Sequence, residues 1–132
     1  MPARFDLVTV DAHNSVELAS FWANALRLRE LETEEDADGP GRWIVLGDAD
    51  GTRRLGVQRI AGLRHASSAI DGPQKSRWHL DVVCDIDEIE TEIERLVAVG
   101  ACIVRAVRRE VYGAIATLVD PEGNIFDVCA YR

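Results

Sequence analysis

Apolar and polar residues alternate along several short segments of this chain, a pattern that predicts β-strands. In the clearest segment, residues 78–85, apolar side chains occupy one face of the predicted strand, while His79 and Asp81 begin the other face. Because His79 and Asp81 are two residues apart on the same face, their imidazole and carboxylate groups are within reach of a common ligand. The same alternation predicts further strands at 4–11, 54–60 and 124–131.

Two segments instead carry apolar residues at helical spacing. The first follows Asn14, a good N-cap residue with Glu17 three positions later, and is expected to run to about residue 28. The second covers residues 86–99, with Asp85 as its expected cap. Four further strands are predicted at residues 30–38, 43–46, 101–107 and 114–119. The first of these is acidic and is expected at a sheet edge.

The order of strand, helix and three strands occurs twice. The halves align at an offset of 72 residues, which pairs Thr9 with Asp81 and the turn at Asp48 with the turn at Asp120. After that turn, one extra residue in the first half aligns Gly56 with Asp127. Units of this size cannot bury their apolar faces alone. We therefore expect an α+β fold in which two βαβββ modules form a curved mixed-sheet half-barrel cup, with one helix backing each sheet.

These modules are expected to form one domain over residues 1–132. Module one covers residues 3–60 and module two covers residues 77–132. The connector between them, residues 61–76, contains glycine, serine and proline without a clear period. A segment of this kind predicts either a linker or a mobile flap.

Composition narrows the classes of partner and the compartment. The net charge of −8 argues against nucleic acids and anionic membrane surfaces, and no apolar run approaches a membrane span. Three cysteines, Cys84, Cys102 and Cys129, form no CxxC motif, which favours reduced thiols and a cytoplasmic location. Cys84 and Cys102 are expected in the core.

The strand faces opposite the helices would line a concave surface for a small-molecule ligand. The expected lining residues are Leu7, Thr9, Gly56 and Gln58 in the first half and His79, Asp81, Asp127 and Cys129 in the second. This surface is apolar in the first half and acidic in the second, which favours a cationic or hydrogen-bond-donating ligand. The side chains of His79 and Asp127, on neighbouring strands, have donor atoms that suit Zn, Fe, Mn or Ni.

Several segments resemble the vicinal oxygen chelate superfamily, which includes glyoxalase I, extradiol dioxygenases, epimerases and bleomycin-binding resistance proteins. The resemblance covers nearly the whole chain and is closest to compact glyoxalase-like proteins. The segments that carry it are 8–11, 18–22, 79–82, 96–101 and 120–128. The last of these, which begins Asp120-Pro121-Glu122-Gly123-Asn124, is the most specific.

The resemblance implies a metal site built from four side chains, two from each half. The matching positions here are Leu7, Gly56, His79 and Asp127. Because Leu and Gly offer no ligand, only His79 and Asp127 would bind a metal, and the site would be incomplete. The expectation is therefore a glyoxalase-like protein that binds a small organic molecule without a metal cofactor.

Two alternatives stay open. One is a divalent-metal-dependent lyase, isomerase or dioxygenase in which Gln58 or Asp81 supplies a third ligand. His79 and Asp81 would also serve as a catalytic acid–base pair if chemistry proceeds without metal. The other alternative is an interaction module without a small-molecule role. The resemblance further implies a homodimer.

Overall fold

The computed structural model describes residues 1–61, 67–68, 72–73 and 78–132. The chain forms two compact units, Met1–Arg64 and His65–Arg132, and each is described by itself. Their boundary falls within the predicted connector, of which most residues lie outside the described parts of the chain. Two short connector segments pair as strands β5 (Ser67–Ser68) and β6 (Gly72–Pro73).

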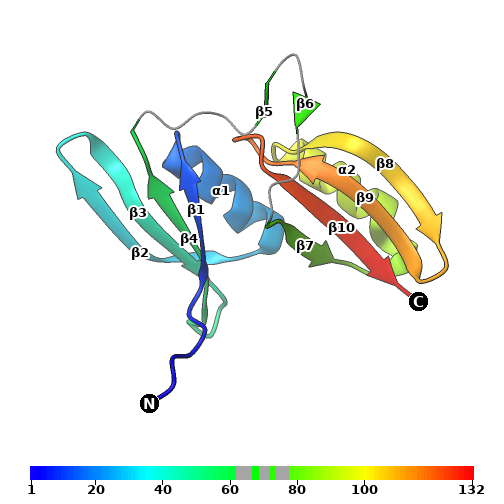
Figure 1. Cartoon of the computed structure of the whole chain (residues 1–132), viewed down its shortest axis with the longest axis horizontal. Coiled ribbons are helices and arrows are strands. Elements are labelled where there is room, and N and C mark those ends of the chain that lie inside the picture. The colour runs from blue at the N-terminus through cyan, green and yellow to red at the C-terminus, as the bar shows by residue number, and fades with distance from the viewer. Residues whose placement is uncertain (62–66, 69–71, 74–77) are drawn as a thin grey trace. The chain divides into compact units, whose positions relative to one another are not determined.

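The first unit contains one helix and a four-stranded mixed sheet (Figure 1). Its elements are β1 (Val8–Ala12), α1 (Ser15–Leu26), β2 (Arg29–Asp36), β3 (Gly39–Gly47) and β4 (Arg53–Arg59). The strand order is β1-β4-β3-β2, with β1 parallel to β4 and the other pairs antiparallel. The acidic strand β2 lies at the edge, as predicted.

The second unit repeats this plan. Its elements are β7 (Leu80–Val83), a 3₁₀ turn η1 (Ile86–Glu88), α2 (Ile89–Ala98), β8 (Cys102–Glu110), β9 (Gly113–Val119) and β10 (Ile125–Tyr131). The order β7-β10-β9-β8, with β7 parallel to β10, matches the first unit strand for strand. The predicted pair of βαβββ modules in an α+β fold is confirmed.

Each helix packs on one face of its own sheet. In the first unit, Leu18, Phe21 and Trp22 of α1 are buried, and the Ser15 hydroxyl donates to the Gly41 carbonyl of β3 at 2.6 Å. In the second unit, α2 packs against β8 and β10 and buries apolar residues on both sides of the contact. They are Ile89, Ile93 and Leu96 on α2 and Phe126 and Val128 on β10. Complete burial of one such side chain stabilises the fold by about 1.5–3 kcal/mol.

The turn before the last strand has the same backbone geometry in both units. Asp48 N–H donates to the Thr52 carbonyl at 2.9 Å, and Asp120 N–H donates to the Asn124 carbonyl at 2.9 Å. Only Asp120 is buried, and its Oδ1 accepts hydrogen bonds from the backbone N–H groups of Glu122 and Asn124, whereas the Asp48 carboxylate accepts from the Arg54 guanidinium. The motif that begins at Asp120 therefore has a structural role.

Several local expectations need correction. Helix α1 ends at Leu26 rather than near residue 28, because Arg27 adopts a left-handed conformation with φ of 54°. Asp85 makes no side-chain capping hydrogen bond, since η1 separates it from α2. Cys102 is exposed on the edge strand β8 and not in the core. Among the described helices, none is long and apolar enough to span a membrane.

Candidate functional site

Three ionisable side chains meet on the second sheet, on the face opposite α2. The parallel pairing of β7 with β10 places Asp81 directly beside Asp127, and His79 immediately precedes β7. His79 Nε2 lies 3.2 Å from Asp81 Oδ1 and 3.3 Å from Asp127 Oδ2. Across the described ranges, this is the group of His, Cys, Asp and Glu side chains whose geometry suits a metal ion, with ligand atoms within 4.8 Å of one another.

The Asp127 carboxylate is the fixed member of this group. Its side chain is only 4% exposed, against 32% for His79 and 57% for Asp81. Thr117 Oγ1, on the adjacent strand β9, donates to Asp127 Oδ1 at 2.7 Å. This hydrogen bond leaves Oδ2 directed at His79. The role of Thr117 was not predicted, although its position across the β9–β10 hairpin from Asp127 is a signal that could have indicated it.

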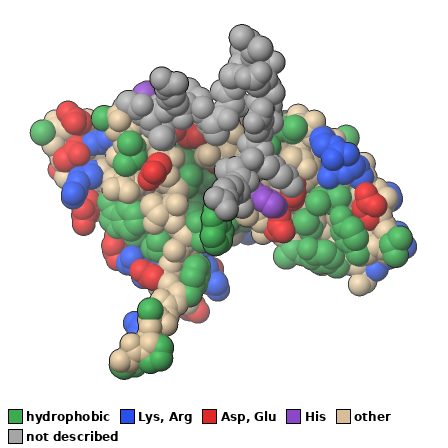
Figure 2. All heavy atoms as spheres, in the orientation of Figure 1, with side chains coloured by type: hydrophobic (Ala, Val, Ile, Leu, Met, Phe, Trp, Pro, Cys, Tyr) green, Lys and Arg blue, Asp and Glu red, His purple; other side chains and the backbone are tan. Residues whose placement is uncertain are grey.

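The donor set fits a divalent cation. One imidazole nitrogen and two carboxylate oxygens are ligands that Mn, Fe and Zn accept. With a neutral imidazole the group carries two negative charges, which a divalent ion would neutralise. Exposure of Asp81 and His79 leaves the remaining coordination positions open to water or to a ligand. In Figure 2 a histidine lies next to acidic groups on the side of this unit that faces the viewer.

The corresponding place in the first unit holds no ligands. Thr9 pairs with Gly56 just as Asp81 pairs with Asp127, and Leu7 precedes β1 as His79 precedes β7. A Cβ atom added to Gly56 would collide with the six-membered ring of Trp43 on β3 and come within 3.0 Å of Thr9 Oγ1. The indole therefore occupies the space that a metal-binding side chain would need at this position.

The two remaining predicted lining residues differ in environment. Gln58 is exposed and pairs with Trp43 across the β3–β4 ladder. Cys129 is buried on β10, on the same face as Asp127. A hydrogen bond with the side chain of Cys129, together with the charge of that group, raises the pKa of Tyr131. No disulfide involves any of the three cysteines.

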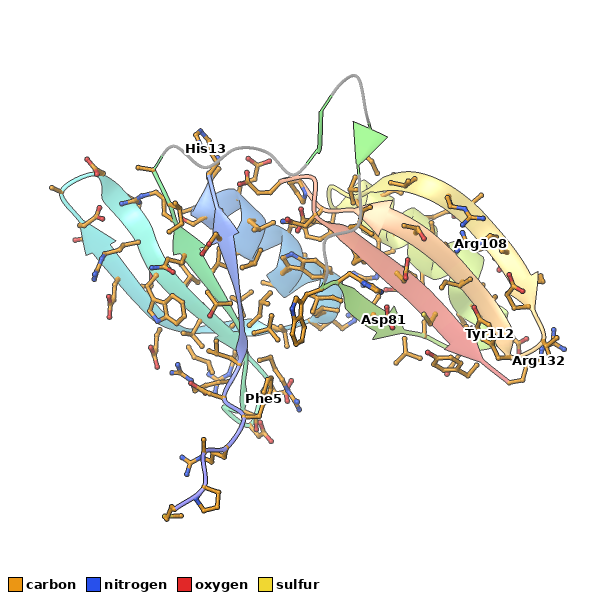
Figure 3. The ribbon with its side chains drawn as sticks, in the orientation of Figure 1. Phe5, His13, Asp81, Arg108, Tyr112 and Arg132 are labelled. Atoms are coloured by element: carbon orange, nitrogen blue, oxygen red, sulfur yellow. The ribbon has the colours of Figure 1, made fainter. Side chains whose placement is uncertain are left out.

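Two arginines share the face of the second sheet with the carboxylates. Arg105 pairs with Thr117, and Arg108 pairs with Ile115, so both side chains lie on the face opposite α2. Figure 3 shows Arg108 and Asp81 on this face. The sequence interpretation treated this half of the surface as acidic and omitted both arginines. The face instead combines negative charge on β7 and β10 with positive charge on β8.

The chain matches a family model described as a glyoxalase-like domain over residues 7–129. No curated protein sequence matches it. Solved structures with the same fold include a glyoxalase/bleomycin resistance protein/dioxygenase family enzyme from Burkholderia phytofirmans PsJN. That protein is 17% identical, with a TM-score of 0.70 over 96% of this chain and 98% of the other.

A second similar structure is a mutant of the genomically encoded fosfomycin resistance protein FosX from Listeria monocytogenes, complexed with Mn(II) and 1S,2S-dihydroxypropylphosphonic acid. It is 15% identical, with a TM-score of 0.71 over 100% of this chain and 93% of that one. A third is TioX from Micromonospora sp. ML1, which is 18% identical, with a TM-score of 0.62 over 98% of this chain and 100% of that one. These likenesses show the fold, and the family match covers both modules. The chain belongs to the glyoxalase-like domain family.

Proposed function

We propose that this protein binds a small organic molecule on the open face of its second sheet, through a divalent metal ion held by His79, Asp81 and Asp127. The observation that carries the proposal is the convergence of three ligand atoms within 4.8 Å on one sheet. Asp81 supplies the ligand that the first unit does not, so the site would be complete within one module.

The surroundings of these residues support a binding role. Thr117 orients the Asp127 carboxylate, as outer-shell hydrogen bonds do in metal sites. A bound divalent ion would act as a Lewis acid toward the oxygen atoms of a ligand. The similar FosX structure contains Mn(II) together with a ligand that has two neighbouring hydroxyl groups. Its composition supports an oxygen-donor ligand for this chain as well.

A direct test is titration of metal-free protein with Mn²⁺, followed by electron paramagnetic resonance of the free ion. Wild type should bind one equivalent, whereas Asp81→Asn and Asp127→Asn should each lose most of the affinity. Asp85→Asn is the matched control. It removes the same charge from an exposed residue between β7 and η1 that makes no side-chain capping hydrogen bond. Equal binding by wild type and Asp81→Asn would refute the proposed site.

A second candidate function is metal-free binding. Because Nε2 of His79 lies within 3.3 Å of both carboxylates, a proton on that nitrogen could be shared with them. The group would then hold a ligand by hydrogen bonds or transfer a proton to it. If no metal binds, a thermal-shift screen of small molecules on wild type and His79→Ala would test this candidate. Ligand-induced stabilisation confined to wild type would support it.

A further inference from the structure

One transverse row of residues links the acidic group to an arginine. Asp81 pairs with Asp127, Asp127 with Thr117, and Thr117 with Arg105, across all four strands of the second sheet. Directly paired residues place their side chains on the same face of a sheet. Neighbouring strands are about 4.8 Å apart, so Arg105 lies about 10 Å from Asp127. The row therefore runs from negative to positive charge along a single line.

The next row adds a second guanidinium. Arg108 pairs with Ile115, which in turn pairs with Cys129 on β10. The β8 register shifts between Arg105 and Arg108, and this irregularity brings both residues to the same face although they are three positions apart. In Figure 2 a basic patch lies on this face, to the right of the histidine and acidic groups, and a group of hydrophobic side chains lies below it.

The neighbouring Arg109 behaves differently. It pairs with Ala114, and its guanidinium forms an ion pair with Glu90 on α2, on the opposite face of the sheet. By contrast, no carboxylate among the described residues forms an ion pair with Arg105 or Arg108. Arg108 Nη1 donates a long hydrogen bond of 3.4 Å to the Ala106 carbonyl, and neither guanidinium is neutralised by a described carboxylate on the face that carries the candidate site.

We infer that Arg105 and Arg108 form an oxyanion subsite, so that the ligand is a small molecule with an acidic group at one end and oxygen donors at the other. Guanidinium groups bind carboxylate, phosphonate and phosphate oxygens through paired hydrogen bonds. The oxygen donors would engage the group at His79, and the body of the molecule would lie over the side chains between the two ends. This inference rests on the proposed function for the metal end only.

The test compares two six-carbon probes with Mn²⁺-loaded protein by isothermal titration calorimetry. The probes, 2-hydroxyadipate and 2-hydroxyhexanoate, share a chelating 2-hydroxycarboxylate end, and only the first has a second carboxylate. Wild type should prefer 2-hydroxyadipate by about tenfold or more. The double variant Arg105→Gln/Arg108→Gln should reduce the preference to within about twofold and leave Mn²⁺ binding unchanged. Arg109→Gln, which alters the same strand on its other face, should keep the full preference.

A preference that survives in the double variant, or is absent in wild type, overturns the inference. The proposed metal site is tested separately, by the binding of Mn²⁺ alone. If Mn²⁺ does not bind, the affinities of metal-free protein for adipate and hexanoate are compared instead. These two probes also differ by one carboxylate, so the comparison still tests the role of the arginines. Preference for adipate that depends on Arg105 and Arg108 would then uphold the subsite while the proposed metal function fails. Lack of binding by both probes would count against the subsite.

Discussion

Thr117 donates a 2.7 Å hydrogen bond to Oδ1 of Asp127 and thereby leaves the other carboxylate oxygen facing His79. The two residues lie opposite each other on β9 and β10, and both are buried. A buried carboxylate that lost this partner would keep its full desolvation cost and lose part of the compensation for it. The hydrogen bond therefore serves both the stability of the fold and the orientation of the proposed metal ligand.

The first prediction concerns this hydrogen bond. Thr117→Val should lower the free energy of unfolding by about 1.5–3 kcal/mol, because the acceptor is charged and buried. It should also weaken Mn²⁺ binding by about 10–100-fold, the usual effect of losing an outer-shell partner. Urea denaturation and Mn²⁺ titration measure the two effects. Thr117→Ser keeps the hydroxyl and should restore most of the metal affinity. A valine variant with unchanged affinity would exclude an orienting role.

The second prediction separates the two matching turns. Asp120→Ala should destabilise the protein by about 2–4 kcal/mol, since Asp120 is buried and accepts hydrogen bonds from Glu122 N–H at 2.9 Å and from Asn124. Asp48→Ala removes the aligned residue, whose carboxylate pairs with Arg54 near the surface. That loss should cost only about 0–1 kcal/mol. Equal costs in urea denaturation would show that the buried hydrogen bonds contribute little.

The third prediction concerns the contact of Trp43 with Gly56. Gly56→Ala should destabilise the protein by about 1–3 kcal/mol, because the new methyl group meets the indole ring and approaches Thr9. In a Trp43→Ala background the same change should cost markedly less, since the ring is gone. A double-mutant cycle of unfolding free energies measures this coupling. Additive effects would mean that the contact with Thr9, rather than the indole, opposes a side chain at Gly56.

A fourth prediction uses the thiols. Cys102 is exposed, Cys129 is buried, and burial of Cys84, followed by the nearby carboxylates, raises the pKa of its thiol. Iodoacetamide at neutral pH should therefore label Cys102 first. Because the thiolate is the reactive form, labelling of Cys84 should keep accelerating with pH above about 8.5, where an ordinary thiol is already half ionised. Peptide mass spectrometry follows each site. Labelling of Cys84 as fast as Cys102 at neutral pH would contradict the assignment.

Most of the fold could be predicted from two features of the sequence, the internal repeat and the alternation of apolar and polar residues in the strands. The repeat alignment, which matches Thr9 with Asp81 and, after one extra residue, Gly56 with Asp127, agrees with the observed pairing of β1 with β4 and of β7 with β10. These short parallel pairs keep a strict period of two, so the shared face of His79, Asp81 and Asp127 could be derived from spacing alone. The end of helix α1 was harder to predict from the sequence, because Arg27 adopts the left-handed conformation at a position that glycine usually occupies.

The arginines could not be placed by the same reasoning. Strict alternation puts Arg105 and Arg108, three positions apart, on opposite faces of a strand. The register shift between them in β8 removes that difference and leaves Arg109 as the residue that faces α2. An irregularity of this kind depends on the partner strand, so it has no signature in the local sequence. The contact of the Trp43 ring with Gly56 likewise depends on packing between strands β3 and β4, so the local sequence does not predict it.

The acidic edge strand β2 has a consequence for how the protein behaves in concentrated solution. An unpaired sheet edge is a template on which another chain can add a strand, the first step toward aggregation. Carboxylates occupy five of the eight positions of β2, and although Glu32, Glu34 and Asp36 pair with arginines, the remaining excess of negative charge makes two such edges repel each other at neutral pH. Protonation below about pH 4 removes this repulsion. Acidified or high-salt stocks are therefore expected to aggregate through β2 before the cores of the two units unfold.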